Sequence, residues 1–161
     1  MTIHIRPANS SDAQTIAHFN TAMAMETEGV QLDVGTILAG VQAGLSDATK
    51  ARYFAAEIDG RVVGCCMITH EWSDWRNGDM WWLQSVYVAP DYRRTGVFRE
   101  MYKHVQSAAR AAGAVVLRLY VERDNIRAKQ TYESLGMYMT HYDVMEAKLT
   151  MLNDAGTGSN H

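Results

Sequence analysis

The stretch that decides the fold reads Tyr87-Val88-Ala89-Pro90-Asp91-Tyr92-Arg93-Arg94-Thr95-Gly96-Val97-Phe98. It connects an apolar strand, expected over Met80–Val88, with an amphipathic helix that begins near Val97 and ends before Gly113. Pro90 ends the strand because proline cannot donate a ladder hydrogen bond. Arginines and a glycine at a strand-to-helix turn offer an anion positive side chains, an unobstructed backbone and the N–H groups of a helix start. The turn therefore predicts a phosphate-bearing ligand.

A second motif lies downstream and reads Asn125-x-x-Ala128-x-x-x-Tyr132-x-x-x-Gly136-Met137. Asparagine is a frequent helix N-cap, so the pattern places Tyr132 two turns into a helix expected over Asn125–Leu135. In this order and spacing the two motifs resemble the GNAT family of N-acetyltransferases, over roughly Tyr53–Leu149. The resemblance implies a mixed α/β (α+β) fold with a mainly antiparallel sheet, a central parallel strand pair splayed by a bulge, and helices on both faces.

The resemblance also implies acetyl-CoA as the co-substrate. The backbone of Val86, Tyr87 and Val88 would hold its pantetheine arm like an added strand, with the Val88 N–H as donor to the oxyanion. The other cofactor-binding residues implied are Arg93, Arg94, Thr95, Gly96, Val97, Phe98, Arg99 and Asn125. Phe98 departs from the family pattern, which usually has glycine or alanine there, and we expect its ring to pack away from the loop. Asn125 has the alternative role of a helix N-cap alone.

Two residues are expected to be catalytic. The resemblance assigns Tyr132 the role of acid toward the leaving thiolate, since a tyrosine of pKa about 10 is protonated at neutral pH. The alternative for Tyr132 is a core aromatic residue on a helix. Glu71, at the end of an apolar strand, is our candidate for the general base, acting directly or through water, and Glu26, Glu28 and His70 are the other candidates. A solvated surface carboxylate is the alternative for Glu71.

The acceptor site is expected beside acids and aromatic rings. Glu26 and Glu28 occupy a helix–helix loop that borders the acceptor in the family resembled, although both have the alternative of solvated surface groups. Trp72 and Trp75 stand among acidic residues, a combination that binds cationic amines through cation–π contacts and charge pairing. The alternative for these indole rings is a core or a dimer interface.

Length and composition exclude several other classes. The 161 residues fit one domain over 1–152 with a polar tail over 153–161. A net charge of −3 argues against a general nucleic-acid binder. Cys65 and Cys66 are adjacent in a strand, so they do not form a disulfide, and no ligand spacing predicts a metal site. No apolar run approaches the roughly 18–20 residues of a membrane span, and we expect a cytoplasmic protein.

The rest of the chain supplies the remaining elements of the fold. Asp59-Gly60 predicts a tight turn between strands over Tyr53–Ile58 and Arg61–Ile68. Ser11 with Gln14 fits a capping box before an apolar helical stripe. Other expected elements are a strand over Thr2–Arg6, a helix containing Val34, Ile37, Leu38, Val41 and Leu45, a strand over Val115–Val121 parallel to Met80–Val88, and a last strand over Tyr138–Leu149.

These observations together predict an acetyl-CoA-dependent N-acetyltransferase that acts on a primary amine by direct attack in a ternary complex. The alternative is a non-catalytic acyl-CoA-binding or sensor module of the same fold. The expected acceptor is a small-molecule or peptide amine, and a homodimer is a further expectation.

Overall fold

The computed structural model describes residues 1–150 of the chain. The chain divides into two compact units, Met1–Leu119 and a second that begins at Tyr120. The single domain expected over 1–152 remains a prediction, and the expected tail 153–161 lies outside the described residues. No helix among residues 1–150 is long and apolar enough to cross a membrane.

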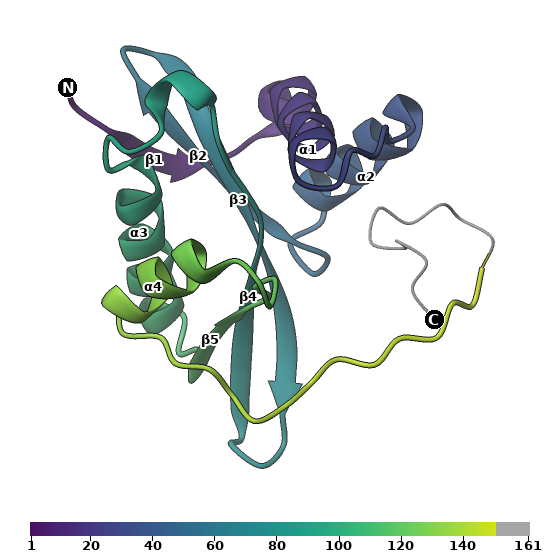
Figure 1. Cartoon of the computed structure of the whole chain (residues 1–161), viewed down its shortest axis with the longest axis vertical. Coiled ribbons are helices and arrows are strands. Elements are labelled where there is room, and N and C mark those ends of the chain that lie inside the picture. Colours follow the sequence, from purple (N-terminus) through teal and green to yellow (C-terminus); the bar gives the residue numbers. More distant parts are fainter. Residues whose placement is uncertain (151–161) are drawn as a thin grey trace. The chain divides into compact units, whose positions relative to one another are not determined.

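The first unit is built on a five-stranded mixed sheet (Figure 1). The strands lie side by side in chain order, and every neighbouring pair is antiparallel except the last, β4 and β5. This last pair is parallel, as predicted, because a helix connects its members. The strands are β1 (His4–Pro7), β2 (Arg52–Ile58), β3 (Arg61–Ser73), β4 (Gly78–Val88) and β5 (Val116–Leu119).

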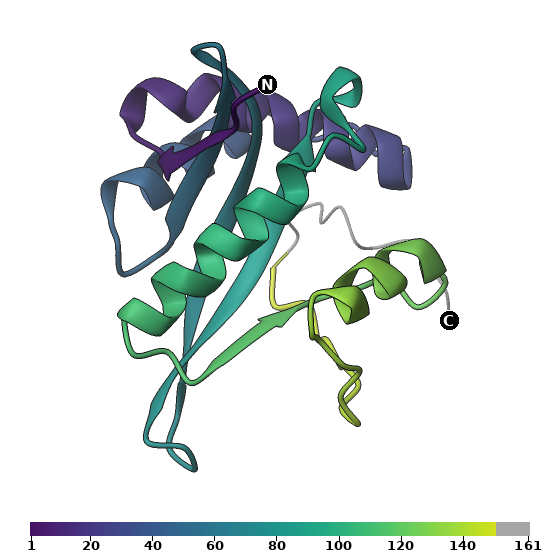
Figure 2. The same cartoon turned by 90° about the vertical axis from the view of Figure 1, so that its left-hand side faces the viewer.

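Helices cover both faces of the sheet (Figures 1 and 2). Helices α1 (Ala13–Glu28) and α2 (Val34–Ser46) lie on one face, and α3 (Val97–Ala111) lies on the other. Their buried stripes form the core, and each fully buried large apolar side chain contributes about 1.5–3 kcal/mol. The predicted mixed α/β fold is thus confirmed. The core beneath α1 and α2 includes Ile16, Phe19, Val41, Tyr53, Cys65 and Tyr87.

The turn between β2 and β3 is the one that the Asp59-Gly60 pair predicts, with φ of 51° and 75° at the two residues. Strand β3 is longer than predicted. Its residues up to Ile68 pair with β2, and its residues up to Ser73 continue to pair with β4. The charged and aromatic residues after Ile68 do not end β3. The strand continues there because its backbone still pairs with β4, although β2 no longer pairs with it.

A β-bulge interrupts β4. Cys65 pairs with Tyr87 and Met67 with Gln84, so β4 has one residue more than β3 between these pairs. Ser85 takes up the extra length with a left-handed φ of 49°. Pairing of β4 with β5 stops at Leu83, just before the bulge. The predicted splay of the parallel pair is confirmed, and β5 is shorter than predicted because its partner turns away.

The N-terminal capping box is not the predicted one. Asn9 and Asp12 form it: the Asn9 side chain accepts from the Ser11 N–H at 2.9 Å, and the Asp12 carboxylate accepts from the Asn9 N–H at 2.8 Å. A short 3-10 helix at Ser10–Asp12 precedes α1 and takes the position that Ser11 and Gln14 were expected to fill. The first strand is also displaced toward Pro7.

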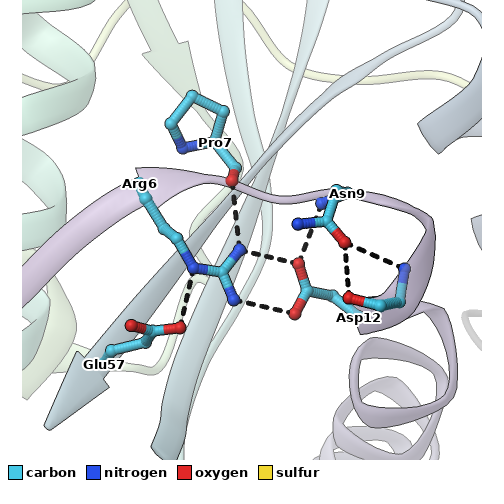
Figure 3. A network of polar contacts seen from close by, with 6 residues as sticks. Arg6, Pro7, Asn9, Asp12 and Glu57 are labelled. Atoms are coloured by element: carbon cyan, nitrogen blue, oxygen red, sulfur yellow. Dashed lines mark hydrogen bonds and ion pairs between the residues drawn. The ribbon is translucent and has the colours of Figure 1, made fainter. Parts of the chain in front are cut away.

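Arg6 connects three of these elements (Figure 3). Its guanidinium donates to both carboxylate oxygens of Asp12 at 2.8 and 2.9 Å and to Glu57 at 2.7 Å. Asp12 is only 5% exposed, and the Arg6 guanidinium, its main hydrogen-bond donor, lowers the pKa of the Asp12 carboxyl below its usual range. β1, β2 and the start of α1 are therefore held together by one charged network.

The second unit contains α4 (Ile126–Ser134), as predicted. The strand expected over Tyr138–Leu149 is wrong, since the described residues after α4 contain no strand. The apolar residues of this segment are exposed, among them Tyr138 at 83% and Met145 at 95%. Alternating apolar residues form a strand only where a neighbouring strand takes their backbone hydrogen bonds, and no such pairing forms among the described residues.

Candidate active site

The backbone edge of β4 beyond the bulge is open on one side. The Ala89 N–H donates to the Val63 carbonyl at 2.8 Å, so it points toward β3. Successive N–H groups of an extended chain point to opposite sides, so Val88 and Val86 direct their N–H and C=O groups away from β3. That is the side on which β5 no longer pairs. The edge can therefore accept an added extended ligand.

Arg93 joins this edge to α1. Its Nε donates to the Val88 carbonyl at 2.8 Å, and its Nη2 donates to Glu26 at 2.7 Å. The Tyr87 hydroxyl donates to the other Glu26 oxygen at 2.9 Å, and the guanidinium lies 5.3 Å from the Tyr87 ring centroid. The hydrogen bond from Arg93, together with the weaker effect of the one from Tyr87, lowers the pKa of Glu26. The pKa of the Tyr87 hydroxyl is raised, mainly by burial and to a smaller extent by its hydrogen bond to Glu26. Glu26 is therefore ionised at neutral pH.

The loop after β4 leads directly into α3. Arg94 and Gly96 have left-handed φ of 63° and 94°, and Gly96 is the N-cap of α3. A Cβ added at Gly96 would meet no atom within 4 Å, so the space in front of the glycine is open. The first amides of a helix have no intrahelical acceptor, and with the helix dipole they favour an anion. The geometry thus suits a phosphate.

The side chains of this loop differ in their surroundings. Arg94, Thr95 and Arg99 are exposed. Val97 is 1% exposed and part of the core, so only its backbone faces a ligand. The Phe98 ring centroid lies 6.2 Å from that of Tyr102, one turn further along α3. That the Phe98 ring packs away from the loop stays a prediction.

Tyr132 and Asn125 belong to the second unit. The Asn125 side chain accepts from the Ala128 N–H at 3.1 Å, so it caps α4. Tyr132 lies in the second half of α4, and burial raises the pKa of its hydroxyl. A raised pKa keeps the hydroxyl protonated at neutral pH, as a proton donor requires.

Glu71 and the exposed tryptophans lie far along the sheet from this open edge. Glu71 pairs with Met80, whereas Val88 pairs with Gly64. Seven residues separate Glu71 from Gly64 along β3, which corresponds to about 23 Å. Trp72, near the end of β3, and Trp75, in the β3–β4 turn, lie still further away and are 61% and 89% exposed. The structure does not bring these residues together with Val88. Glu28 ends α1 and is exposed.

The sequence-based prediction missed a polar group on the sheet itself. The Gln84 amide donates to the Thr69 hydroxyl at 2.6 Å, and Arg118 of β5 forms an ion pair with Glu71 at 3.5 Å. A glutamine and an arginine within apolar strands were the available signals. Among residues 1–150 no group of histidine, cysteine and acidic side chains is arranged to hold a metal ion.

Comparisons with known proteins agree with this geometry. The acetyltransferase (GNAT) family model matches residues 24–137. A possible acetyltransferase from Clostridium difficile 630 has 44% identity and a TM-score of 0.86, with 93% of this chain and 99% of that chain covered. A predicted acetyltransferase from Clostridium acetobutylicum, solved with acetyl-CoA, has 15% identity and a TM-score of 0.75 over 92% and 97% of the chains, and so shares the fold.

A curated relative matches a shorter region. The thialysine N-epsilon-acetyltransferase of Bos taurus is 35% identical over 75 residues, which are 47% of this chain and 44% of the relative. The match thus spans less than half the length of that protein. The family model, by contrast, covers most of the chain, including the open edge of β4, the loop after it and α4. The chain therefore belongs to the GNAT family of acetyltransferases.

Proposed function

We propose that the protein transfers an acetyl group from acetyl-CoA to a primary amine by direct attack in a ternary complex. The observation that carries the proposal is the open backbone edge at Val86 and Val88, followed within a few residues by the Gly96 loop and the start of α3. An extended arm with an amide backbone suits the edge, and a pyrophosphate suits the loop.

The acetyl end of this arm is assigned to Val86. The phosphates would lie at the loop after β4, so the arm runs back along β4 toward the bulge. The backbone of Val88 is then positioned to hydrogen-bond an amide of the arm. The N–H of Val86, two residues nearer the bulge, is positioned to donate to the thioester oxygen. This replaces Val88 as the oxyanion donor expected from the sequence. Tyr87, between Val86 and Val88, directs its backbone groups toward β3 and so leaves the cofactor-binding role expected for it, and its hydroxyl is bonded to Glu26.

The chemistry needs no protein nucleophile. The acceptor's ammonium group first loses a proton to water, and its neutral nitrogen then attacks the thioester carbon. The Val86 N–H stabilises the oxyanion that forms. The carbon–sulfur bond then breaks, and the thiolate takes a proton from Tyr132. The nitrogen loses its proton to water, and water restores the Tyr132 proton. Burial raises the pKa of the Cys65 thiol to about 12 and also raises that of Cys66, so neither forms a thiolate for an acyl-enzyme.

The acceptor is assigned to the α1 side of the site. Glu26, which is ionised and next to Tyr87, and Glu28 at the end of α1 would attract an ammonium group. Trp72 and Trp75 are left out of this acceptor site because they lie at or near the far turn. The name of the bovine relative supports an amine at the end of an amino-acid side chain.

A thiol-release assay tests this function. Acetyl-CoA is mixed with the protein and, one at a time, a polyamine, an aminoglycoside, lysine and a peptide, and the acetylated product is identified by mass spectrometry. We expect amine-dependent thiol release with at least one acceptor, and its loss in Gly96→Glu. Thiol release that does not depend on any amine would contradict the proposal.

A further inference from the structure

The α1 and α2 face of the sheet continues beyond the two helices. Side chains of directly paired residues share a face, and positions two apart along a strand do the same. Cys65 and Tyr87, in the core beneath α1 and α2, define this face. Further along it, toward the β3–β4 turn, lie Met67, Thr69, Glu71, Met80, Trp82, Gln84 and Arg118.

Glu71 and Arg118 form a loose pair on this face. Their ion pair is 3.5 Å long, whereas charge-assisted hydrogen bonds are about 2.7–2.9 Å. The Glu71 side chain is 46% exposed and that of Arg118 is 21% exposed. Within residues 1–150 the Arg118 guanidinium makes no further ion pair and no hydrogen bond, so its N–H donors remain available to a ligand.

Trp82 orients the arginine. The Arg118 guanidinium carbon lies 5.8 Å from the centroid of the Trp82 ring. A ring contact restricts a planar guanidinium, and a restricted guanidinium loses less entropy when it binds a carboxylate with two parallel hydrogen bonds. One anchored cation and one exposed anion, side by side, are complementary to the two charges of a free amino acid.

We infer that Glu71 and Arg118 bind the α-ammonium and α-carboxylate of a free amino acid whose side-chain amine accepts the acetyl group. The inference rests on the proposed function and names its substrate class. Arg118 makes the site selective, because an acceptor that carries only positive charges would be repelled by its guanidinium.

The length of the acceptor follows from the register. Arg118 pairs with Trp82, which pairs with Thr69, and Val86 lies at the bulge, level with Cys66. Cys66 is three residues from Thr69 along β3, or about 10 Å at strand spacing. Lysine spans about 7–8 Å from its carboxyl carbon to its side-chain nitrogen, six single bonds of about 1.5 Å projected on the chain axis. A hydrogen bond of about 2.8 Å to the Arg118 guanidinium brings the total to about 10 Å, so the side-chain nitrogen reaches the level of Val86.

The test compares lysine with 1,5-diaminopentane, which is lysine without its carboxylate. We expect wild-type kcat/KM to favour lysine by about tenfold or more, the effect of one charge-assisted recognition contact. Arg118→Gln removes this preference, because it raises KM for lysine and lowers KM for 1,5-diaminopentane, which the guanidinium no longer repels. Arg118→Lys retains part of the preference. Arg61→Gln, an exposed arginine on the same sheet, is the matched control and retains all of it.

Glu71→Gln separates binding from base catalysis. A binding role raises KM for lysine and leaves kcat and its pH profile unchanged, whereas a lower kcat with a lost acidic limb would identify a general base and overturn the inference. Equal loss for both substrates in Arg118→Gln would also overturn it. If that variant does not fold, lysine amide against lysine on wild type decides the role of the carboxylate.

Failure of the inference and failure of the proposed function give different results. If polyamines or aminoglycosides are acetylated and lysine is not, the inference is wrong and the N-acetyltransferase stands. If acetyl-CoA does not bind and no amine is acetylated, the proposed function is wrong and the inference is lost with it.

Discussion

At the residue scale, Gly96 has the backbone conformation that side chains tolerate least. Its φ of 94° is left-handed, and an added Cβ would meet open space rather than protein. Gly113, near the other end of α3, shares both properties with a φ of 80°. The two glycines therefore separate backbone strain from ligand contact.

Gly96→Ala and Gly113→Ala are expected to cost similar stability. An alanine held at a left-handed φ lowers the free energy of unfolding by about 1 kcal/mol in each variant. Only Gly96→Ala is expected to weaken acetyl-CoA binding, by about tenfold, because its Cβ enters the space assigned to the pyrophosphate. Urea unfolding and calorimetric titration give the two quantities. Equal acetyl-CoA affinity in the two variants would place the phosphates elsewhere.

Tyr132→Phe is expected to separate chemistry from binding. The acetyl-CoA dissociation constant stays within a few-fold of wild type, while kcat falls by about 10²–10⁴ with the loss of the acid. Because burial raises the Tyr132 pKa, any alkaline limb that it causes lies above the ordinary range for tyrosine and disappears in the variant. Wild-type turnover in Tyr132→Phe, with chemistry limiting the rate, would exclude this proton donor.

At the scale of elements, two charged networks hold the first unit together. Glu26 of α1 bonds both Tyr87 of β4 and Arg93 of the following loop. Arg6 of β1 bonds both Asp12 and Glu57. The first network is exposed and adjoins the candidate site, whereas the second is partly buried and away from it. We therefore expect the first to affect ligand binding and the second to affect stability.

Glu26→Gln is expected to strengthen acetyl-CoA binding slightly. The exposed Glu26–Arg93 pair competes with phosphates for the guanidinium, and such pairs contribute up to about 1 kcal/mol, or about fivefold in affinity. Glu28→Gln, two residues later and without an ion pair among the described residues, is the control and leaves the affinity unchanged. Weaker binding by Glu26→Gln, measured by calorimetry, would show instead that Glu26 orients Arg93 toward the ligand.

Asp12→Ala is expected to destabilise the protein by about 3 kcal/mol at neutral pH, since it leaves a partly buried arginine without its main partner. The folded-state pKa of Asp12 is lowered, so its contribution is complete above the ordinary carboxyl pKa of about 3.9 and is lost as the pH falls through the lowered value. Urea unfolding of wild type and Asp12→Ala at pH 7 and pH 3 measures the loss of stability and its dependence on pH. A stability difference between the two proteins that persists unchanged at pH 3 would rule out the ion pair as its source.

At the scale of the whole molecule, local chemistry was predictable and long-range register was not. The Asp59-Gly60 turn and the start of α3 follow from residues adjacent in the chain. The bulge at Ser85 was expected only from the family resemblance, because nothing in a serine demands it. The Glu71–Arg118 pair joins residues 47 positions apart, which only the sheet register brings together. Residues 138–149 show that an alternating pattern fails where no neighbouring strand pairs with it.

The central claim is that the open edge of β4 and the start of α3 bind acetyl-CoA. The most direct measurement is the thermal unfolding of wild type and Gly96→Glu over a range of acetyl-CoA concentrations. A ligand at 100 times its dissociation constant stabilises the native state by about 2.7 kcal/mol, which raises the Tm of a chain of this size by roughly 5–10 °C. We predict this rise for wild type and none for Gly96→Glu; a wild-type Tm unchanged at millimolar acetyl-CoA would contradict the account.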